Sequence, residues 1–257
     1  MFENGQTAAM LDTSIPRPAD ARTFVTRRRL RLSDWDASGR TRLDAVARLL
    51  QDAAIDDVEE TGLGAPEHLW FLRSAQVDVI APLLHDREVE IVTWCSGVAA
   101  IAAGRRWSVV GDAGGHIEVD SIWIHLDSEQ RPTRVGEFGP HTGSARARVA
   151  STKLLLPDPP PSASRRPWSL RSTDVDAHGH INNAVHWQAV EDRLARAAFD
   201  VTRPYRVFID YRTPIDLEDR VEIAEAFVGE GHLLGFLVAD RVAAVAVVDR
   251  QLAASPP

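Results

Sequence analysis

The sequence predicts an α+β protein made of two tandem copies of one fold, each a long helix packed on an antiparallel sheet. Three observations predict it. Two parts of the chain resemble each other, a proline-rich stretch separates them, and each part has one helical pattern followed only by strand patterns. The 257 residues, 44% hydrophobic and 26% charged, leave room for two compact domains.

The repeat is visible in two separate segments. The stretch LRLSDWDASGRTRLDAVARLLQDA begins at Leu30, and SLRSTDVDAHGHINNAVHWQAVED begins at Ser169. Residues 81–91 and 213–223 also match, in a proline and in a shared Val-Glu-Ile. Two matches in the same order indicate one fold used twice. The aligned pairs include Asp34 with Asp174, Asp36 with Asp176, Ala37 with Ala177, Gly39 with Gly179, Asp52 with Asp192 and Pro82 with Pro214.

The proline-rich stretch sets the expected domain boundaries. Proline continues neither a helix nor a central strand, so LPDPPPSASRRPW is read as an extended linker. We expect an N-terminal arm at 1–22, a first domain at 23–155, a linker at 156–167 and a second domain at 168–257.

Each copy is expected to begin with a short strand and a turn containing Asp and Gly, followed by a helix. Apolar residues then recur at helical spacing, less evenly in the second copy. They are Leu43, Val46, Leu49, Leu50, Ala53 and Val58 in the first copy, and Val185, Trp187, Val190, Leu194 and Ala198 in the second. Strand patterns follow at 74–81, 87–94, 104–110 and 118–126, and at 205–212, 220–228, 232–239 and 241–248.

One helix followed by a meander of strands buries the helix on one face of the sheet, which is the hotdog arrangement. A single hotdog has an exposed sheet edge that invites pairing. Two copies in one chain join their edges, so we expect a pseudo-dimer with a continuous sheet and neighbouring helices.

Composition excludes several functions. The net charge of -8 argues against a general nucleic-acid binder. No apolar run is long enough for a membrane span, so we expect no membrane insertion. With Cys95 as the single cysteine, no internal disulfide forms, which favours a reducing, cytoplasmic location. Cys95 lies in a strand pattern and is expected to be a buried structural thiol.

The candidate site is the stretch 173–192, TDVDAHGHINNAVHWQAVED. A helix begins near Asn182 or Asn183, and free N–H groups at a helix start suit a developing oxyanion. Asp176 supplies a carboxylate and His180 an imidazole beside this start, and Gly179 permits a tight turn. These groups are the ingredients of acyl transfer from a thioester, whose thiolate leaves readily.

The first copy has Ser38 for His178, Arg40 for His180, and Arg42 and Leu43 for the two asparagines. Chemistry that needs imidazole is therefore expected in the second copy only.

Other readings of these residues stay open. Asp176 is a turn residue in one of them, His180 a structural histidine, and the asparagines helix caps only. His186 is expected to face solvent, and Glu191 is either a second carboxylate near the site or a solvated residue. The histidine spacing matches no common zinc site, and neither a nucleophile elbow nor a phosphate loop is present, so we expect no metal and no cofactor.

These segments together resemble the acyl-acyl-carrier-protein (acyl-ACP) thioesterases of plants and bacteria, which are tandem hotdog proteins. The resemblance covers nearly the whole chain after about residue 24 and is most specific in DVDAHGHINNAVHWQAVED, where the family typically reads Asp-x-Asn-x-His-Val-Asn-Asn. The other matching segments are SGRTRLDAVARLLQDAA, VEIVTWCSG, GRRWSVVGD and SIWIHLDSEQRPTRV.

The resemblance implies hydrolysis of a fatty acyl-ACP thioester to free fatty acid and ACP. By position, Asp176 becomes the catalytic carboxylate, acting as base or as nucleophile, and His180 the family histidine, with His178 assisting where the family has asparagine. Asn182, Asn183, Gly179 and Trp187 are assigned to substrate binding. Plant members carry Glu and Cys after the YRR strand, where this chain has Pro214 and Ile215.

The resemblance also implies an apolar tunnel for the acyl chain and a basic face for the acyl-phosphopantetheine of the acidic ACP. The candidates for limiting chain length are Trp70, Phe71, Trp94, Trp107 and Trp123. The candidates for the basic face are Arg27, Arg28, Arg29, Arg105, Arg106, Arg165 and Arg166. An acyl-CoA thioesterase and a non-catalytic acyl-binding hotdog remain as alternatives, as do a monomer and a homodimer. A hotdog dehydratase is disfavoured because its Asp-x-Asn-Pro-x-His pattern is absent.

Overall fold

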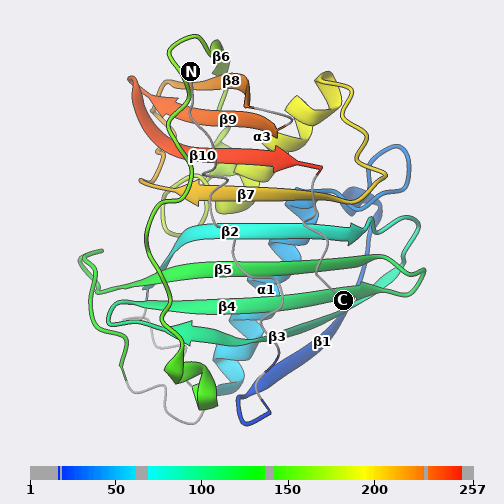
Figure 1. The fold of residues 1–257 in the computed structure, drawn as a ribbon, viewed down its shortest axis with the longest axis vertical. Coiled ribbons are helices and arrows are strands. Elements are labelled where there is room, and N and C mark those ends of the chain that lie inside the picture. Colours follow the sequence, from blue (N-terminus) through cyan, green and yellow to red (C-terminus); the bar gives the residue numbers. More distant parts are fainter. Residues whose placement is uncertain (1–16, 18, 62–68, 137–141, 229–230, 251–257) are drawn as a thin grey trace.

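The computed structural model describes residue 17 and residues 19–61, 69–136, 142–228 and 231–250. Within them, ten strands form one mostly antiparallel sheet, and two helices, α1 (Leu43–Thr61) and α3 (Asn183–Arg196), lie behind it in the view of Figure 1. This is the helix-on-sheet layering of a hotdog-like fold. The strands of the first half are β1 (Thr23–Arg29), β2 (Leu69–Ala81), β3 (Glu88–Val98), β4 (Ala102–Gly111) and β5 (His116–Leu126). Those of the second half are β6 (Ser164–Trp168), β7 (Tyr205–Tyr211), β8 (Val221–Val228), β9 (Gly231–Val238) and β10 (Arg241–Asp249).

The strand order β1-β3-β4-β5-β2-β7-β10-β9-β8-β6 reads the same from both ends once β1 is matched with β6 and β2 with β7. The two halves meet where β2 pairs with β7, with Ser74 opposite Asp210 and Asp78 opposite Arg206. Arg206 and Asp78 form a buried ion pair across this seam. The seam is therefore a normal antiparallel ladder in the middle of the sheet.

The helices form where the apolar spacing predicts them, and their apolar sides face the core. Leu43, Val46 and Leu50 of α1 are buried, as are Val190 and Leu194 of α3. The two helices touch, and Gln188 Nε2 donates to Asp44 Oδ2 at 3.3 Å. The expectation for Ala198 was wrong. The helix ends at Arg196, and Ala198 lies beyond it with φ of 51°.

All eight predicted strands are confirmed, and β2 is longer than expected at its N-terminal end. The predicted linker differs from the structure, because its last residues 164–167 belong to strand β6, which pairs with β8. Pro167 is tolerated there because β6 is the last strand of the sheet, where one side of the backbone needs no partner.

The segment before β6 crosses the sheet on the face turned away from the helices (Figure 1). Arg73 Nε donates to Thr152 O at 3.1 Å, and the backbone N–H groups of Leu155 and Leu156 donate to Asp210 Oδ2 at 2.8 Å each. The two bonds to Asp210 Oδ2 and the bond from Arg73 hold the connection over the β2–β7 seam.

Cys95, on β3, is partly buried, and its Sγ lies 3.5 Å from Gly97 O. Burial raises the pKa of this thiol, as expected for a structural cysteine. No helix in the described part of the chain is long and apolar enough to cross a membrane.

Candidate active site

The turn that carries the candidate residues occurs twice with the same backbone hydrogen bonds. Asp176 N donates to His180 O at 2.9 Å, and Gly179 N donates to Asp176 O at 3.0 Å. The first copy repeats both bonds with Asp36, Gly39 and Arg40. Gly179 has φ of 84° and Gly39 of 82°, a conformation that favours glycine. The turn thus explains why both copies have the Asp and the Gly, and the residues that differ distinguish the second copy from the first.

Asn182 caps helix α3 and also holds the candidate carboxylate. Its Oδ1 accepts from Ala184 N at 2.8 Å, which is the N-cap bond, and its Nδ2 donates to Asp176 Oδ2 at 3.3 Å. The prediction of a helix start here is confirmed. Asp176 Oδ1 accepts from His178 N at 2.9 Å, so both carboxylate oxygens are held in place.

The structure pairs His180 with a carboxylate that the sequence comparison missed. His180 Nδ1 lies 2.6 Å from Asp216 Oδ1, on the loop that follows β7. A carboxylate at Nδ1 favours the tautomer with its proton there and leaves a lone pair on Nε2. Nε2 is buried and has no hydrogen-bond partner among the described residues, although the side chain as a whole is 32% exposed. A histidine held in this way is prepared to accept a proton inside the protein.

A signal for Asp216 was present in the repeat. The alignment that sets Pro82 on Pro214 sets Leu84 on Asp216, so the carboxylate is another polar residue found in the second copy only. The structure supports this alignment, since Thr41 N donates to Leu83 O and Ile181 N donates to Ile215 O, both at 2.9 Å.

His178 is exposed, and its side chain makes no hydrogen bond within the described residues. The structure brings Asp176 together with Asn182, and His180 together with Asp216, while the His178 ring stands apart from both pairs. An assisting role for His178 finds no contact to support it here.

An apolar pocket of about 50 Å³ lies between the two helices and the sheet. Asn183 and Trp187 of α3 line it, opposite Gln51 of α1 and the tryptophans Trp107 and Trp123. Of the five aromatic residues predicted to limit chain length, Trp107 and Trp123 line this pocket, whereas Trp70, Phe71 and Trp94 do not. The remaining lining residues are Leu43, Val46, Ala47, Leu50, Leu72, Ala75, Val77, Val119 and Ser121.

The expectation that His186 faces solvent was wrong. The residue is 4% exposed, and its ring makes edge contacts with Trp168, Tyr211 and Phe236. Burial lowers the pKa of His186 to about 4, which the carbonyl groups of Asn182 and Asn183 partly oppose. His186 is a neutral core residue at neutral pH.

Most of the arginines proposed for a basic face are neutralised. Arg106 is 2% exposed and therefore unavailable to a partner, which corrects that assignment. Arg27 pairs with Glu90 and Arg105 with Asp57. Further ion pairs join Arg28 to Asp56, Arg29 to Glu88, and Arg165 to Glu222 and Asp240. Arg166 on β6 is exposed, and no ion pair is found for it within the described residues.

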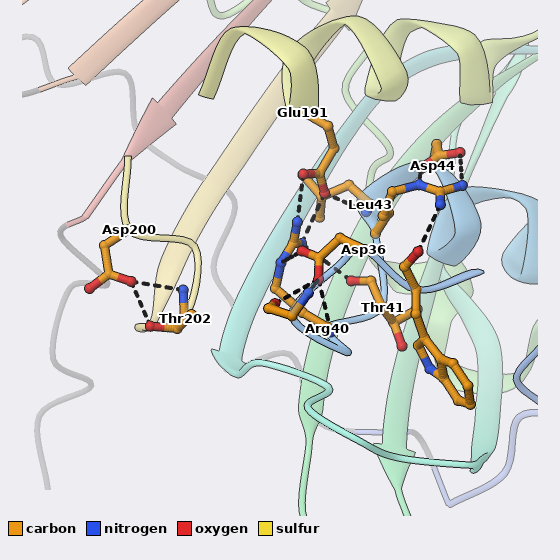
Figure 2. A network of polar contacts seen from close by, with 11 residues as sticks. Asp36, Arg40, Thr41, Leu43, Asp44, Glu191, Asp200 and Thr202 are labelled. Carbon is orange, nitrogen blue, oxygen red and sulfur yellow. Dashed lines mark hydrogen bonds and ion pairs between the residues drawn. The ribbon is translucent and has the colours of Figure 1, made fainter. Parts of the chain in front are cut away.

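Glu191 is not a solvated residue, because its side chain is 11% exposed and pairs with Arg40. It reaches from α3 toward the turn of the first copy, where Arg40 donates Nη1 to Oε1 at 2.9 Å and Nη2 to Oε2 at 2.7 Å (Figure 2). Arg40 Nε also donates to Asp36 Oδ2 at 3.0 Å. The arginine that replaces the second-copy histidine is therefore fully engaged in a buried ion-pair network.

In the described part of the chain, no group of three or more His, Cys, Asp or Glu residues is arranged to hold a metal ion.

Comparison with known proteins finds matches to one family over most of the chain. The family model "Acyl-ACP thioesterase N-terminal domain" matches residues 21–137, and "Acyl-ACP thioesterase C-terminal domain" matches residues 159–248. Two uncharacterised proteins of Mycobacterium tuberculosis, from the CDC 1551 and H37Rv strains, are each 28% identical over 242 residues, which cover 92% of this chain and 95% of theirs.

Solved structures share the fold. A putative oleoyl thioesterase of Lactobacillus plantarum has a TM-score of 0.73 at 18% identity, covering 90% of this chain and 96% of its own. The 12:0-ACP thioesterase of Umbellularia californica has a TM-score of 0.73 at 16% identity, covering 88% and 96%. An acyl-ACP thioesterase of Bacteroides thetaiotaomicron has a TM-score of 0.68 at 13% identity, covering 88% and 97%.

Proposed function

This chain belongs to the acyl-ACP thioesterase family and hydrolyses acyl-ACP thioesters, and we propose that His180, Asp216 and Asp176 carry out the reaction. The observation that carries the proposal is the His180 side chain, whose Nδ1 is bound to Asp216 while its buried Nε2 meets no partner among the described residues. Loss of the plant-type Glu and Cys at Pro214 and Ile215 is then compensated by the carboxylate at the next position, Asp216.

In the proposed first step, His180 Nε2 removes a proton from water as the water oxygen adds to the thioester carbonyl carbon. Asp216 keeps its hydrogen bond to Nδ1 and stabilises the imidazolium that forms. The carbonyl electrons move to oxygen and give a tetrahedral oxyanion. When the C–S bond breaks, His180 returns the proton to the leaving thiolate, which yields the fatty acid and the thiol of ACP.

Asp176 is proposed to hold the attacking water and not to attack the carbonyl itself. Both of its oxygens already accept hydrogen bonds, from His178 N and from Asn182 Nδ2, and these bonds stabilise the carboxylate charge. A carboxylate stabilised in this way is a weaker nucleophile, but its remaining lone pairs still accept a hydrogen bond from water.

The backbone N–H of Asn183 is proposed to stabilise the oxyanion. It is the first N–H of helix α3 and finds no acceptor in the described part of the chain. A helix start favours negative charge, and Asn183 also lines the apolar pocket where the acyl chain is proposed to bind. The pocket is narrow, so an acyl chain must displace some of the lining side chains.

We propose further that the chain is two hotdog units, at 23–155 and from Ser164 onward, which form an internal pseudo-dimer. The palindromic strand order, the β2–β7 ladder and the repeated turn support this pairing. The natural donor is expected to be acyl-ACP and not acyl-CoA, and the exposed Arg166 is proposed to contact the acidic partner. With one cysteine, the chain suits the reducing cytoplasm.

The test is release of free thiol from octanoyl, lauroyl and palmitoyl thioesters of ACP and of CoA, by wild type, His180→Ala and Asp176→Ala. We expect wild type to turn over the ACP thioesters, and both variants to lose on the order of 10²-fold or more in kcat with the fold intact by circular dichroism. Faster turnover of the CoA thioesters makes the protein an acyl-CoA thioesterase. Tight binding without thiol release makes it an acyl-binding protein and ends the proposal.

A further inference from the structure

The first copy of the repeat serves as a comparison for the candidate active site in the second copy. Gln51 stands at the same place in α1, counted from its first residue Leu43, as Glu191 does in α3, counted from Asn183. Glu191 crosses from α3 to the start of α1 (Figure 2). The reciprocal placement, with Gln51 of α1 facing the start of α3, is supported independently, because Gln51 and Asn183 line the same pocket.

In the first copy, a carboxylate of the protein occupies the place of a bound anion. Glu191 Oε1 accepts from the backbone N–H of Leu43 at 2.7 Å and from Arg40 Nη1 at 2.9 Å. The corresponding groups of the second copy are the N–H of Asn183 and the side chain of His180. These groups belong to the proposed active site, and no protein oxygen is bound to either Asn183 N or His180 Nε2 within the described residues.

We propose that Gln51 completes the active site from the other half of the chain, by donating a hydrogen bond from Nε2 to the thioester carbonyl oxygen. The oxyanion then lies between the Asn183 N–H and the Gln51 amide, where the first copy holds the Glu191 carboxylate oxygen. This assignment rests on the proposed function, because it identifies a second donor for the same reaction.

The residue type at position 51 decides whether the protein itself fills the anion position at the helix start. A glutamate side chain is as long as a glutamine side chain. Glu191 accepts a hydrogen bond from the Leu43 N–H and pairs with Arg40, and a glutamate at position 51 is able to make the corresponding contacts. A neutral glutamine offers two N–H donors and no negative charge. Gln51 makes no hydrogen bond in the described structure, so its amide is available to substrate.

The experiment compares kcat and KM for lauroyl-ACP hydrolysis by wild type, Gln51→Ala and Gln51→Glu. Loss of an oxyanion donor lowers kcat, so we expect Gln51→Ala to lose about 10² in kcat with KM within a few-fold of wild type. Gln51→Glu is expected to lose more than Gln51→Ala, because its carboxylate fills the anion position. Both variants should melt within a few degrees of wild type.

Glu191→Gln is the matched control, because it makes the reciprocal change in the first-copy pocket. Its kcat should stay within about twofold of wild type, although its melting temperature falls because Arg40 loses a buried partner. His180→Ala distinguishes a failure of the Gln51 assignment from a failure of the proposed function. If His180→Ala is inactive but the Gln51 variants keep wild-type kcat, change only KM, or fail to fold, the assignment of Gln51 is overturned. If His180→Ala is as active as wild type, the proposed function fails first.

Discussion

Arg40 and His180 occupy the same position of the same turn but make different contacts. Arg40 is buried and donates hydrogen bonds to the carboxylates of both Glu191 and Asp36. His180 instead turns to Asp216, and its Nε2 has no hydrogen-bond partner in the part of the chain that the structure describes. The turn is therefore a shared scaffold, and the two copies differ in the side chain it presents and in the carboxylate that this side chain meets.

The sequence suggested His180 and Asp176 as site residues because they stand in a recognisable motif. Asp216 escaped notice because it lies outside the motif, and only the fold brings the loop after β7 to His180. His186 was misjudged for a related reason. The residue lies beside the apolar stripe of α3, and it is buried by Trp168 of β6, a strand that the prolines had hidden in a predicted linker.

At the residue scale, His186 predicts an acid sensitivity. Its pKa is lowered by burial to about 4, so between pH 7 and 5 the unfolded imidazole gains a proton that the folded one does not. Stability is lost as the pH falls through this range, by about 2 kcal/mol from this residue. His186→Phe keeps an aromatic ring and should lack this loss.

Urea unfolding of wild type and His186→Phe at pH 7 and pH 5 measures the effect. Between pH 7 and pH 5, the unfolding free energy of wild type should fall by about 2 kcal/mol more than that of His186→Phe. Because the other titrating groups are common to both proteins, a difference that does not change with pH contradicts the burial argument.

At the element scale, helix α3 links stability to catalysis through Asn182. Asn182→Ala removes both the cap of the helix and the donor to Asp176, and should cost about 1 kcal/mol of stability and about tenfold in kcat. Asn182→Ser keeps a capping oxygen but lacks the amide donor. It should therefore retain most of the stability and show a similar loss of kcat, by urea unfolding and thiol release. Equal losses of stability in the two variants would show that the cap is not the source.

The tryptophans of strands β4 and β5 set a second expectation at this scale. Trp123→Leu removes a ring from the pocket wall and should raise the ratio of kcat/KM for palmitoyl-ACP over octanoyl-ACP by about tenfold. Trp94→Leu is the control, because Trp94 is buried outside the pocket and should lower the melting temperature without changing this ratio. An equal shift in both variants assigns the effect to loosened packing.

Helices and strands were predictable from spacing, because each has a continuous apolar face that the core requires. The start of α3 was predictable from its asparagines. The longer β2 and the crossing segment before β6 were not predictable. Both depend on contacts with residues far along the chain, such as the bonds from Leu155 and Leu156 to Asp210.

At the scale of the whole molecule, the chain leaves two strands at the ends of its sheet, β1 and β6. β1 ends in three arginines, and β6 carries two arginines and Pro167, features that discourage edge-to-edge pairing. We therefore expect a monomer. Size-exclusion chromatography with light scattering should give 28.3 kDa at all protein concentrations tested, and a stable particle of twice that mass would contradict this.

The whole-molecule arrangement also explains why the candidate site needs both halves. The turn and α3 come from the second half, whereas Gln51, Trp107 and Trp123 come from the first. In the first copy, the corresponding helix N–H and the turn residue Arg40 instead hold the Glu191 carboxylate (Figure 2).

The proposed reaction depends most on His180 being held as a base by Asp216. The direct test is kcat for lauroyl-ACP hydrolysis by Asp216→Asn, beside Glu218→Gln, which changes an exposed carboxylate of the same loop. We predict a loss of about 10² in kcat for Asp216→Asn at unchanged KM and melting temperature, partial recovery in Asp216→Glu, and no change in Glu218→Gln. Wild-type kcat in Asp216→Asn would contradict the account, because the carboxylate bound to His180 would then have no part in the reaction.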